Sequence, residues 1–402
     1  MNPLTGKRII LGVTGSIAAY KAADLASKLH QTGALLDVIL TAGALNFITP
    51  LTFQSVTGRK AYTDTDLWGG EGHVTHIGLG HHADALVIAP ASANTLARLA
   101  HGIGDNLLSV TALAASCPLI LAPAMDGDMY AHPATQANLE ILHQRGAQLI
   151  GPAEGHLASG LIGKGRMVEP LEIIGHLRCL LGRSGALTNR RVVVTAGGTQ
   201  EALDPVRVLT NRSSGKQGYA LAQAAIDLGA TVTLITAPSV LPPPVGAVVR
   251  RVINAAEMMA AVLQETADAD VLIMAAAVAD FRPKSIAVQK MKKSGGLPHV
   301  ELEPTEDILA AVARRRVETG FPRRTIGFAA ETEALLANAS VKLAAKKLDL
   351  IAANDVSAPD AGFEVDTNRV VLLFADGRQE NLEKATKTEV AEMIMQRVVA
   401  WF

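Results

Sequence analysis

Short apolar runs alternate with amphipathic segments along the first half of the chain. The runs are rich in Val, Ile, Leu and Ala and end in glycine or polar residues, a pattern typical of strands that are buried on both faces. They lie at residues 8–13, 35–40, 85–90, 118–122 and 147–151. Strand–helix alternation of this kind predicts a doubly wound parallel sheet, whose ligand binds at the carboxyl ends of the strands.

The same pattern starts again in the second half. Strands are predicted at 191–195, 231–236, 270–275, 325–328 and 349–352, followed by a hairpin of 368–374 and 378–382 around Asp376-Gly377. A helix over 171–181 and a glycine-containing linker at 182–186 separate the halves. The sequence therefore predicts two α/β domains, at residues 1–189 and 190–402.

Each half opens with a strand that runs into a glycine turn and then a helix. The first copy spans residues 8–21 and the second begins at 191–199. Unpaired backbone N–H groups and the helix dipole favour an anion at such a turn. We therefore expect each half to handle a nucleotide.

Composition narrows the class of partner. The net charge is −1 and aromatic residues make up 3% of the chain, so neither a polyanion partner nor a base-stacking surface for nucleic acid is indicated. The two cysteines, Cys117 and Cys179, lack metal-ligand spacing, which argues against zinc and fits a reducing cytoplasm. No leader precedes the first strand, and the most apolar stretch, 107–125, contains prolines that favour helix, turn and strand over a membrane span. A cytoplasmic protein without a membrane partner is expected.

The first turn lacks the signature of a dinucleotide site. Such a site needs Gly-x-Gly-x-x-Gly and an acidic residue about 20 positions later, but the turn here is Gly12-Val-Thr-Gly-Ser-Ile-Ala18 and the second strand ends at Thr41. Hydroxyls and amides instead follow three strand ends, at Ser16, Thr41, Ser92, Asn94 and Thr95. These groups suit one phosphate and the polar edge of a ring, as in flavin mononucleotide (FMN), although each could equally be a helix N-cap.

A histidine group precedes the third strand, with His76 near its centre. No carboxylate or thiol set accompanies it, so a metal site is not indicated. His76 is singled out because the segments 89–95, 123–126 and 155–167 are expected at the same edge of the sheet.

Ordered motifs then give a family resemblance. The first half resembles the flavin-dependent phosphopantothenoylcysteine decarboxylases through Gly15-Ser-Ile-Ala-Ala-Tyr-Lys21, His76-Ile, Ala-Pro-Ala-Ser-Ala-Asn-Thr95, Pro-Ala-Met125 and Gly165-Arg-Met167. The second half is similar to phosphopantothenate–cysteine ligase through motifs that begin at Thr195, Asn211, Ala275, Gly327 and Asp349. Together the halves resemble the bifunctional bacterial proteins of coenzyme A biosynthesis.

For the first half, the resemblance implies a flavodoxin-like sheet of the homo-oligomeric flavin-containing Cys decarboxylase type. In that family FMN oxidises the cysteinyl thiol to a thioaldehyde, CO2 leaves, and the enethiolate is reprotonated and reduced to give 4′-phosphopantetheine. The resemblance makes His76 the acid or base near the thiol. It implies FMN contacts at Gly15, Ser16, Ile17, Thr41, Phe47, Ser92, Asn94, Thr95 and Ser109.

Two candidate catalytic positions depart from the commonest form of this family. Asp126 stands where many members have an Asn that holds the substrate carboxylate, and a second carboxylate would repel the first unless one is protonated or a cation intervenes. Ser159 stands where many members have a proton-donating Cys, and a hydroxyl is a far weaker acid than a thiol of pKa about 8.5. One interpretation is an active variant subfamily that changes both positions together. The other is that the oxidative half proceeds while the reductive half is slow or uses another acid.

For the second half, the resemblance implies a Rossmann-like domain that uses CTP to activate 4′-phosphopantothenate as an acyl-cytidylate, which the amine of cysteine attacks. Asn211 is expected to act on the acyl intermediate. Gly215-Lys216 is not a Walker loop, since the upstream glycine is Thr210, but the helix it opens, 216–228, offers a phosphate or carboxylate cradle. The implied CTP contacts are Met274, Ala275, Ala276, Asp280, Lys290, Glu306, Asp307, Ile308, Leu309, Phe328, Lys342 and Lys346.

Lys342 and Lys346 also have support that is independent of the resemblance. They stand four apart on a predicted helix, so both ammonium groups project from one face and could clamp a triphosphate, a solvated basic face being the alternative. Lys290 lies in a basic segment, 284–296, that is predicted to be a mobile flap where other lysines could serve equally. Triphosphate chemistry implies Mg²⁺, but its ligands stay unassigned because no full ligand set is visible.

Two other functions remain open from the sequence alone. The chain could be a ligase only, with an FMN-binding first half that Asp126 and Ser159 disable or that serves assembly. It could also be an NAD-linked oxidoreductase, which Thr41 and the missing acidic residue disfavour. The resemblance further implies a homo-oligomer, trimer-based and possibly dodecameric.

Overall fold

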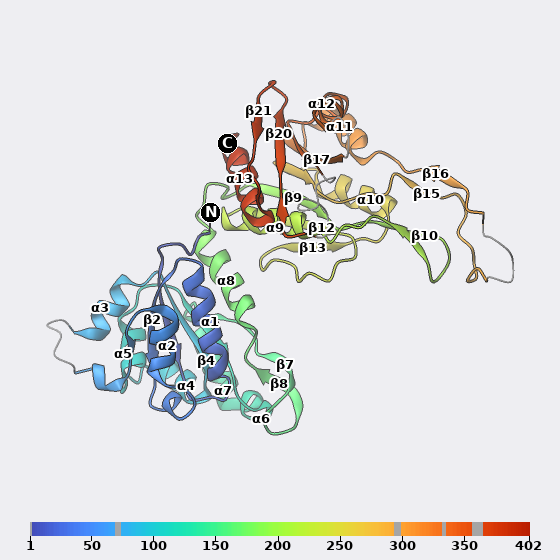
Figure 1. Cartoon of the computed structure of the whole chain (residues 1–402). Helices are drawn as coiled ribbons and strands as arrows, with labels where there is room; N and C mark the ends of the chain where they lie inside the picture. The colour runs from blue at the N-terminus through green and yellow to red at the C-terminus, as the bar shows by residue number, and fades with distance from the viewer. Residues whose placement is uncertain (1, 69–73, 293–298, 332–334, 356–364) are drawn as a thin grey trace. The chain divides into compact units, whose positions relative to one another are not determined.

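The computed structural model describes residues 2–68, 74–292, 299–331, 335–355 and 365–402. The chain forms two compact units, residues 2–181 and 182–402 (Figure 1). The functional boundary expected between residues 189 and 190 stays a prediction. In the described part of the chain, no helix is both long and apolar enough to cross a membrane.

The first unit contains a six-stranded sheet in which all neighbouring strands are parallel. The strand order is β3-β2-β1-β4-β5-β6, where the strands are β1 Arg8–Val13, β2 Leu35–Leu40, β3 Ala61–Tyr62, β4 Ala85–Ala91, β5 Leu119–Pro123 and β6 Gln148–Leu149. Without the short edge strand β3, which the sequence did not predict, the order is the flavodoxin-like one. The predicted fold class is therefore confirmed. The last strand is shorter than the predicted 147–151 because only Gln148 and Leu149 pair with β5.

Helices cover both faces of this sheet because β1 and β4 bury almost every side chain. One apolar cluster joins the sheet to α1, α2 and α8, and a second joins it to α4, α5 and α7. The helices are α1 Ala19–Gln31, α2 Pro50–Thr57, α3 Thr75–His82, α4 Ala93–His101, α5 Leu107–Ala114, α6 Gly127–Ala131, α7 Pro133–Gln144 and α8 Pro170–Gly182. An antiparallel hairpin of β7 Ala153–His156 and β8 Ile162–Arg166 follows the sheet and was not predicted.

The second unit has an eight-stranded sheet of order β13-β12-β9-β14-β17-β18-β20-β21. Its strands are parallel as far as β18 and antiparallel beyond it. They are β9 Arg191–Ala196, β12 Thr231–Thr236, β13 Val248–Arg251, β14 Val271–Met274, β17 Arg324–Glu331, β18 Leu350–Asp355, β20 Val370–Phe374 and β21 Gln379–Asn381. The strand order reverses between β9 and β14, which is where open α/β sheets bind ligands.

Five helices and three small ribbons complete the second unit in its described part. The helices are α9 Lys216–Asp227, α10 Ala255–Glu265, α11 Ile308–Thr319, α12 Leu335–Ala345 and α13 Lys387–Val399. The antiparallel ribbons pair β10 Gln200–Ala202 with β11 Val208–Thr210, β15 Phe281–Pro283 with β16 Leu302–Pro304, and β19 Thr367–Asn368 with β22 Ala385–Thr386. The predicted flap begins directly after β15, and its residues 293–296 lie outside the described residues.

Candidate active sites

The first unit has a pocket of about 810 Å³ at the carboxyl end of its sheet. Its walls come from the β1–α1 turn, the start of α4, the segment after β5 and the β7–β8 hairpin. Six predicted site residues line this pocket, namely Gly15, Ser16, Ile17, Ser92, Asp126 and Ser159. The volume lies in the range of pockets that bind cofactors. At the start of α1, which lines the pocket, the N–H groups of Ala19 and Lys21 donate to the carbonyls of Ser16 and Ala18.

A buried hydroxyl fixes the geometry of the sheet edge beneath this pocket. Thr14, which has no exposed surface, donates a hydrogen bond to the carbonyl of Pro90 at 2.7 Å and accepts one from the N–H of Ser92 at 3.0 Å. Ser92 in turn caps α4 by accepting from the N–H of Thr95. The ends of β1 and β4 are thus joined at the switch point by a residue that the sequence did not single out.

Lys21 also lines the pocket, and in the sequence it stood out only as the last residue of a motif. Lys21 is 7% exposed, and its Nζ donates to the carbonyl of Met167 at 3.1 Å and to Glu169 at 2.6 Å. The bonds hold the end of the β7–β8 hairpin against α1. Only the tertiary contact reveals this position, because a lysine in a helix is usually exposed.

Asp126 and Ser159 lie in direct contact in the pocket. The hydroxyl of Ser159 donates to Oδ2 of Asp126 at 2.5 Å, and the N–H of Asp128 donates to Oδ1 at 3.1 Å, which makes Asp126 the N-cap of α6. The Ser159 hydrogen bond, followed by that of Asp128, lowers the pKa of Asp126. Asp126 is therefore an anion at neutral pH, and the Ser159 proton points toward it.

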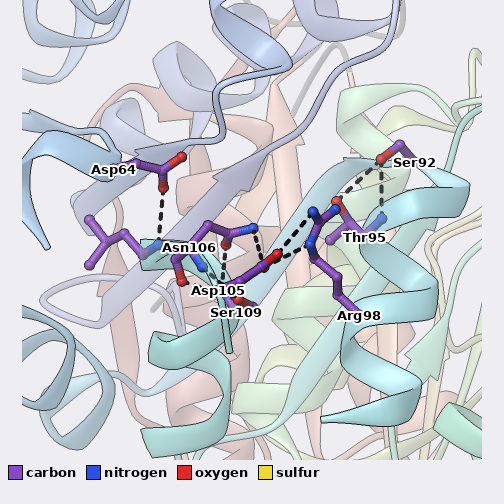
Figure 2. A network of polar contacts seen from close by, with 8 residues as sticks. Asp64, Ser92, Thr95, Arg98, Asp105, Asn106 and Ser109 are labelled. Atoms are coloured by element: carbon purple, nitrogen blue, oxygen red, sulfur yellow. Dashed lines mark hydrogen bonds and ion pairs between the residues drawn. The ribbon is translucent and has the colours of Figure 1, made fainter. Parts of the chain in front are cut away.

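Several predicted residues do not line the pocket in this chain. Figure 2 shows Ser92 and Thr95 at the start of α4 and Ser109 in the first turn of α5. Ser109 is 2% exposed, and its hydroxyl completes a capping box with Asn106. Also absent from the pocket lining are Thr41, Phe47, Asn94 and Thr95.

His76 is likewise outside the pocket lining. It is the second residue of α3 and is half-buried. Its Nδ1 atom is buried and has no hydrogen-bond partner among the described residues. A buried ring nitrogen without a partner is costly, so this atom is available to a group outside the described residues.

The second unit has two adjoining pockets at its switch point. One, of about 370 Å³, is lined by all the predicted CTP contacts except Ala275 and Lys290. The other, of about 290 Å³, contains Asn211, Ala275 and the start of α9. Four residues line both pockets, namely Ala276, Val278, Asp280 and Phe328. A ligand could therefore extend from one pocket into the other.

The segment 275–280, which forms the shared wall, is held by two buried threonines. Thr195 accepts a hydrogen bond from the N–H of Ala276 at 3.1 Å, and Thr199 accepts one from Ala279 at 2.9 Å. Both threonines have no exposed surface. The amide of Asn211 donates to the carbonyls of Ala277 and Val278, each at 3.3 Å.

Lys342 and Lys346 line the pocket of about 370 Å³, which they reach from α12 and the residue after it. Lys342 lies in the helix, whereas Lys346 follows its last residue but keeps a helical hydrogen bond to the Lys342 carbonyl at 2.9 Å. Lys346 pairs with Asp307, the N-cap of α11. Although burial acts to raise the pKa of Asp307, the Lys346 hydrogen bond and others outweigh it, and the pKa is lowered.

Lys290 is exposed and does not line either pocket. Its segment is held from the β10–β11 ribbon, because the N–H of Met291 donates to the buried carboxylate of Asp204 at 3.2 Å. In the described part of the chain, no group of three or more His, Cys, Asp or Glu side chains is arranged to hold a metal ion.

A doubly wound unit with a cofactor-sized pocket, followed by a Rossmann-like unit with a bipartite pocket, is the architecture expected of a flavoprotein fused to a nucleotide-handling domain. The Flavoprotein family matches residues 2–181, and the family described as DNA/pantothenate metabolism flavoprotein C-terminal domain matches residues 187–402. The first unit is thus a flavoprotein domain, which removes the NAD alternative.

The chain belongs to the family of coenzyme A biosynthesis bifunctional protein CoaBC. It is 45% identical to the Bacillus subtilis protein over 400 residues, covering 99% of this chain and 98% of that protein. The Vibrio cholerae protein is 44% identical over 397 residues, covering 98% of each, and the Mycobacterium tuberculosis protein is 43% identical over 407 residues, covering 98% of this chain and 97% of that protein. The resemblance drawn from the motifs is confirmed. The chain is a bifunctional enzyme, a phosphopantothenoylcysteine synthetase and decarboxylase.

Proposed function

We propose that the adjoining pockets of the second unit carry out CTP-dependent ligation of cysteine to 4′-phosphopantothenate, and that the pocket of the first unit carries out FMN-dependent decarboxylation of the product. The observation that carries the first assignment is the convergence of the predicted CTP contacts from β14, α11, β17 and α12 on one pocket. Convergence of sequence-distant residues on one cavity is what a substrate site requires.

The bipartite shape supports an acyl-cytidylate route. Lys342 and Lys346 supply positive charge at one end, where a triphosphate would bind. Asn211 lies in the adjoining pocket, close to the backbone of Ala277 and Val278, where the carboxylate to be activated would meet the nucleotide. The lysines would neutralise the leaving pyrophosphate, and Mg²⁺ would enter as part of the nucleotide complex.

The pocket of the first unit fits FMN, as judged by its volume and by its place at the start of α1. When bound, FMN supplies the electron acceptor and donor that the decarboxylation needs. Lys21 and the β7–β8 hairpin would close one wall over the substrate. Asp126 would hold a cationic or protonated group rather than a second bare carboxylate, since its own pKa is lowered. We retain His76 as the acid or base near the thiol, although its side chain does not line the pocket.

The test combines a visible spectrum of the purified chain with an assay that depends on CTP and cysteine and is read by mass. We expect a yellow protein that forms 4′-phosphopantothenoylcysteine only with CTP and then removes CO2 from this product. Colourless folded protein that cannot be reconstituted with riboflavin phosphate would contradict the FMN assignment. Ligation that proceeds without CTP would contradict the nucleotide assignment.

One observation favours a second candidate. The contact between Asp126 and Ser159 leaves no thiol acid in the pocket and orients the hydroxyl proton toward a carboxylate. The reductive half of the decarboxylation would then be slow, or the first unit would serve binding and assembly only. Yellow protein that ligates but releases no CO2 would establish the binding and assembly role, whereas CO2 release that leaves the unsaturated product unreduced would establish the slow reductive half. A trimer-based homo-oligomer and a cytoplasmic location complete the proposal and rest on the family alone.

A further inference from the structure

A second lysine, far along the chain, enters the pocket at the start of α9. Lys387 is the first residue of α13, and it lines this pocket together with Lys216, the first residue of α9. Lys387 is only 7% exposed. A buried lysine at a pocket wall is rare because its charge must be compensated.

The start of α13 is held firmly in place, so Lys387 is not a surface side chain caught by chance. Thr386 and Glu389 form a capping box that fixes the first turn of α13. The amide of Gln217 donates to the Lys387 carbonyl at 3.2 Å, and the N–H of Lys387 donates to the carbonyl of Asp366 at 2.9 Å. The first of these bonds joins α13 to α9 across 170 positions of sequence, and the second joins α13 to the residue just before β19.

Two lysines, Lys216 and Lys387, and two carboxylates, Asp280 and Asp366, lie at or beside this pocket, and the lysines are the more buried pair. Nζ of Lys216 pairs with Oδ1 of Asp366 at 2.6 Å, but the Asp366 side chain is 83% exposed, so water already screens much of its charge. Asp280 also lines the pocket, at the wall shared with the neighbouring pocket, and is exposed. The start of α9 adds partial positive charge to that of the two lysines.

An unsatisfied amide on the same wall also calls for a ligand. Oδ1 of Asn354, at the end of β18, is buried and has no hydrogen-bond partner among the described residues. Asn354 lines the pocket with both lysines. The unpaired oxygen is an acceptor and needs a donor, so a phosphate oxygen would be bound here only with the amide turned to present its NH2.

We propose that Lys387 and Lys216 together bind a phosphate group of a ligation substrate, and that Asp366 is a resident counter-ion which this phosphate displaces. The cradle at 211–216 was expected from the sequence; the structure adds Lys387 as a binding residue and Asp366 as its competitor. The proposal rests on the proposed ligase function. The phosphate belongs either to the nucleotide or to the acid substrate, since both carry phosphate and the pocket of about 290 Å³ admits either.

The experiment compares Lys387→Met with Lys384→Met in the full chain. Lys384 is an exposed lysine on the segment that leads into α13, and its replacement is expected to change nothing. Lys387→Met should raise the KM for one phosphate-bearing substrate about tenfold or more, as removal of a charge-assisted hydrogen bond does, while the KM for cysteine stays the same. A rise confined to CTP assigns the phosphate to the nucleotide, and one confined to 4′-phosphopantothenate assigns it to the acid.

Direct binding separates this proposal from the proposed function. Calorimetric titration of inorganic pyrophosphate and of 4′-phosphopantothenate needs no turnover, so it is informative even if ligation with CTP fails. Lys387→Met should weaken at least one of these affinities, Lys387→Arg should restore part of it, and Asp366→Asn should strengthen it a few-fold. Unchanged affinity for both probes, or an equal loss of cysteine affinity in Lys387→Met, would overturn the proposal.

Discussion

The hydroxyl of Ser159 donates a hydrogen bond to the carboxylate of Asp126, with Oγ and Oδ2 2.5 Å apart. This contact couples the two positions that depart from the commonest family pattern. It explains why they would change together: a thiol acid is replaced by a hydroxyl whose proton is committed to a neighbouring anion. A proton held in this way is not available to an enethiolate.

Replacing this serine tests that consequence. Ser159→Cys is expected to increase the rate of formation of saturated 4′-phosphopantetheine by a factor of ten or more, on the order expected for a general acid, because a thiol of pKa about 8.5 can release its proton. The original chain should form up to one equivalent of the unsaturated product per flavin, because the two electrons taken from the substrate stay on FMN when reduction of the product is slow. This product has two hydrogens fewer than 4′-phosphopantetheine, and mass spectrometry distinguishes the two. Ser159→Ala serves as the control and should resemble the original chain. Clean 4′-phosphopantetheine from the original chain at normal turnover would contradict the slow-reduction hypothesis.

Lys21 is expected to stabilise the pocket through the end of the hairpin. Lys21→Met removes the hydrogen bond to the buried carbonyl of Met167 and the pair with Glu169. The free energy of unfolding of the first unit should fall by about 1–3 kcal/mol, the cost of leaving a buried acceptor unpaired. Chemical denaturation followed by flavin absorbance measures it. Lys28→Met, on the same helix, removes only an exposed pair with Asp24 and should cost under about 1 kcal/mol; equal losses in both variants would contradict the prediction.

Two glycines of one strand should differ sharply in their tolerance of a methyl group. A Cβ at Gly165 would lie 2.2 Å from the carbonyl oxygen of Met125, whereas a Cβ at Gly163 would meet nothing within 4 Å. Gly165→Ala must therefore push β8 away from the segment after β5, at a cost of about 1–3 kcal/mol, and should lower flavin retention. Gly163→Ala is the matched control. Thermal melts and the visible spectrum of both variants check the difference, and identical behaviour would show that the wall is not closely packed.

In the second unit, the buried hydroxyl of Thr199 should control the wall shared by the two pockets. Thr199→Val leaves the N–H of Ala279 without its acceptor in a buried position, so we expect a loss of about 1–3 kcal/mol in unfolding free energy and a higher KM for CTP. Thr199→Ser keeps the acceptor and should keep the KM. If both variants shift the KM equally, the methyl group rather than the hydrogen bond holds the segment.

The parts that the sequence predicted well are those with local causes. The strands β1, β2, β9 and β12 were located because continuous apolar runs bounded by polar residues specify them. Short, half-exposed ribbons such as β7–β8 lack such runs, and their pairing depends on what they pack against. The motifs also located part of each pocket lining, but they did not reveal the burial of Lys21 or Lys387, because the burial of a lysine follows from distant parts of the chain. Ser109 was predicted as a site residue from the family resemblance, but its hydroxyl caps the first turn of its own helix, α5.

Phosphate binding beside Lys387 is expected to take up protons. Burial, and after it the neighbouring charge of Lys216, lower the pKa of Lys387, whereas Asp366 acts in the opposite direction. Lys216 and Asp280 line the same pocket as Lys387, and Asp366 pairs with Lys216. A bound phosphate favours the ammonium form and raises the pKa of Lys387 again. When the pH is near or above the lowered pKa of the free protein, Lys387 therefore takes up protons as phosphate binds, and the affinity for phosphate falls as the pH rises.

Calorimetric titration of pyrophosphate in two buffers of different ionisation enthalpy measures this uptake. The titrations should span about pH 7 to 10, below the ordinary pKa of lysine. Pyrophosphate itself exchanges protons, so the informative quantity is the difference between the original chain and Lys387→Met. The original chain should take up more protons, and its affinity should decline more steeply with rising pH. Equal proton uptake by both proteins at every pH would mean that Lys387 keeps one protonation state throughout, and that its charge does not respond to the phosphate.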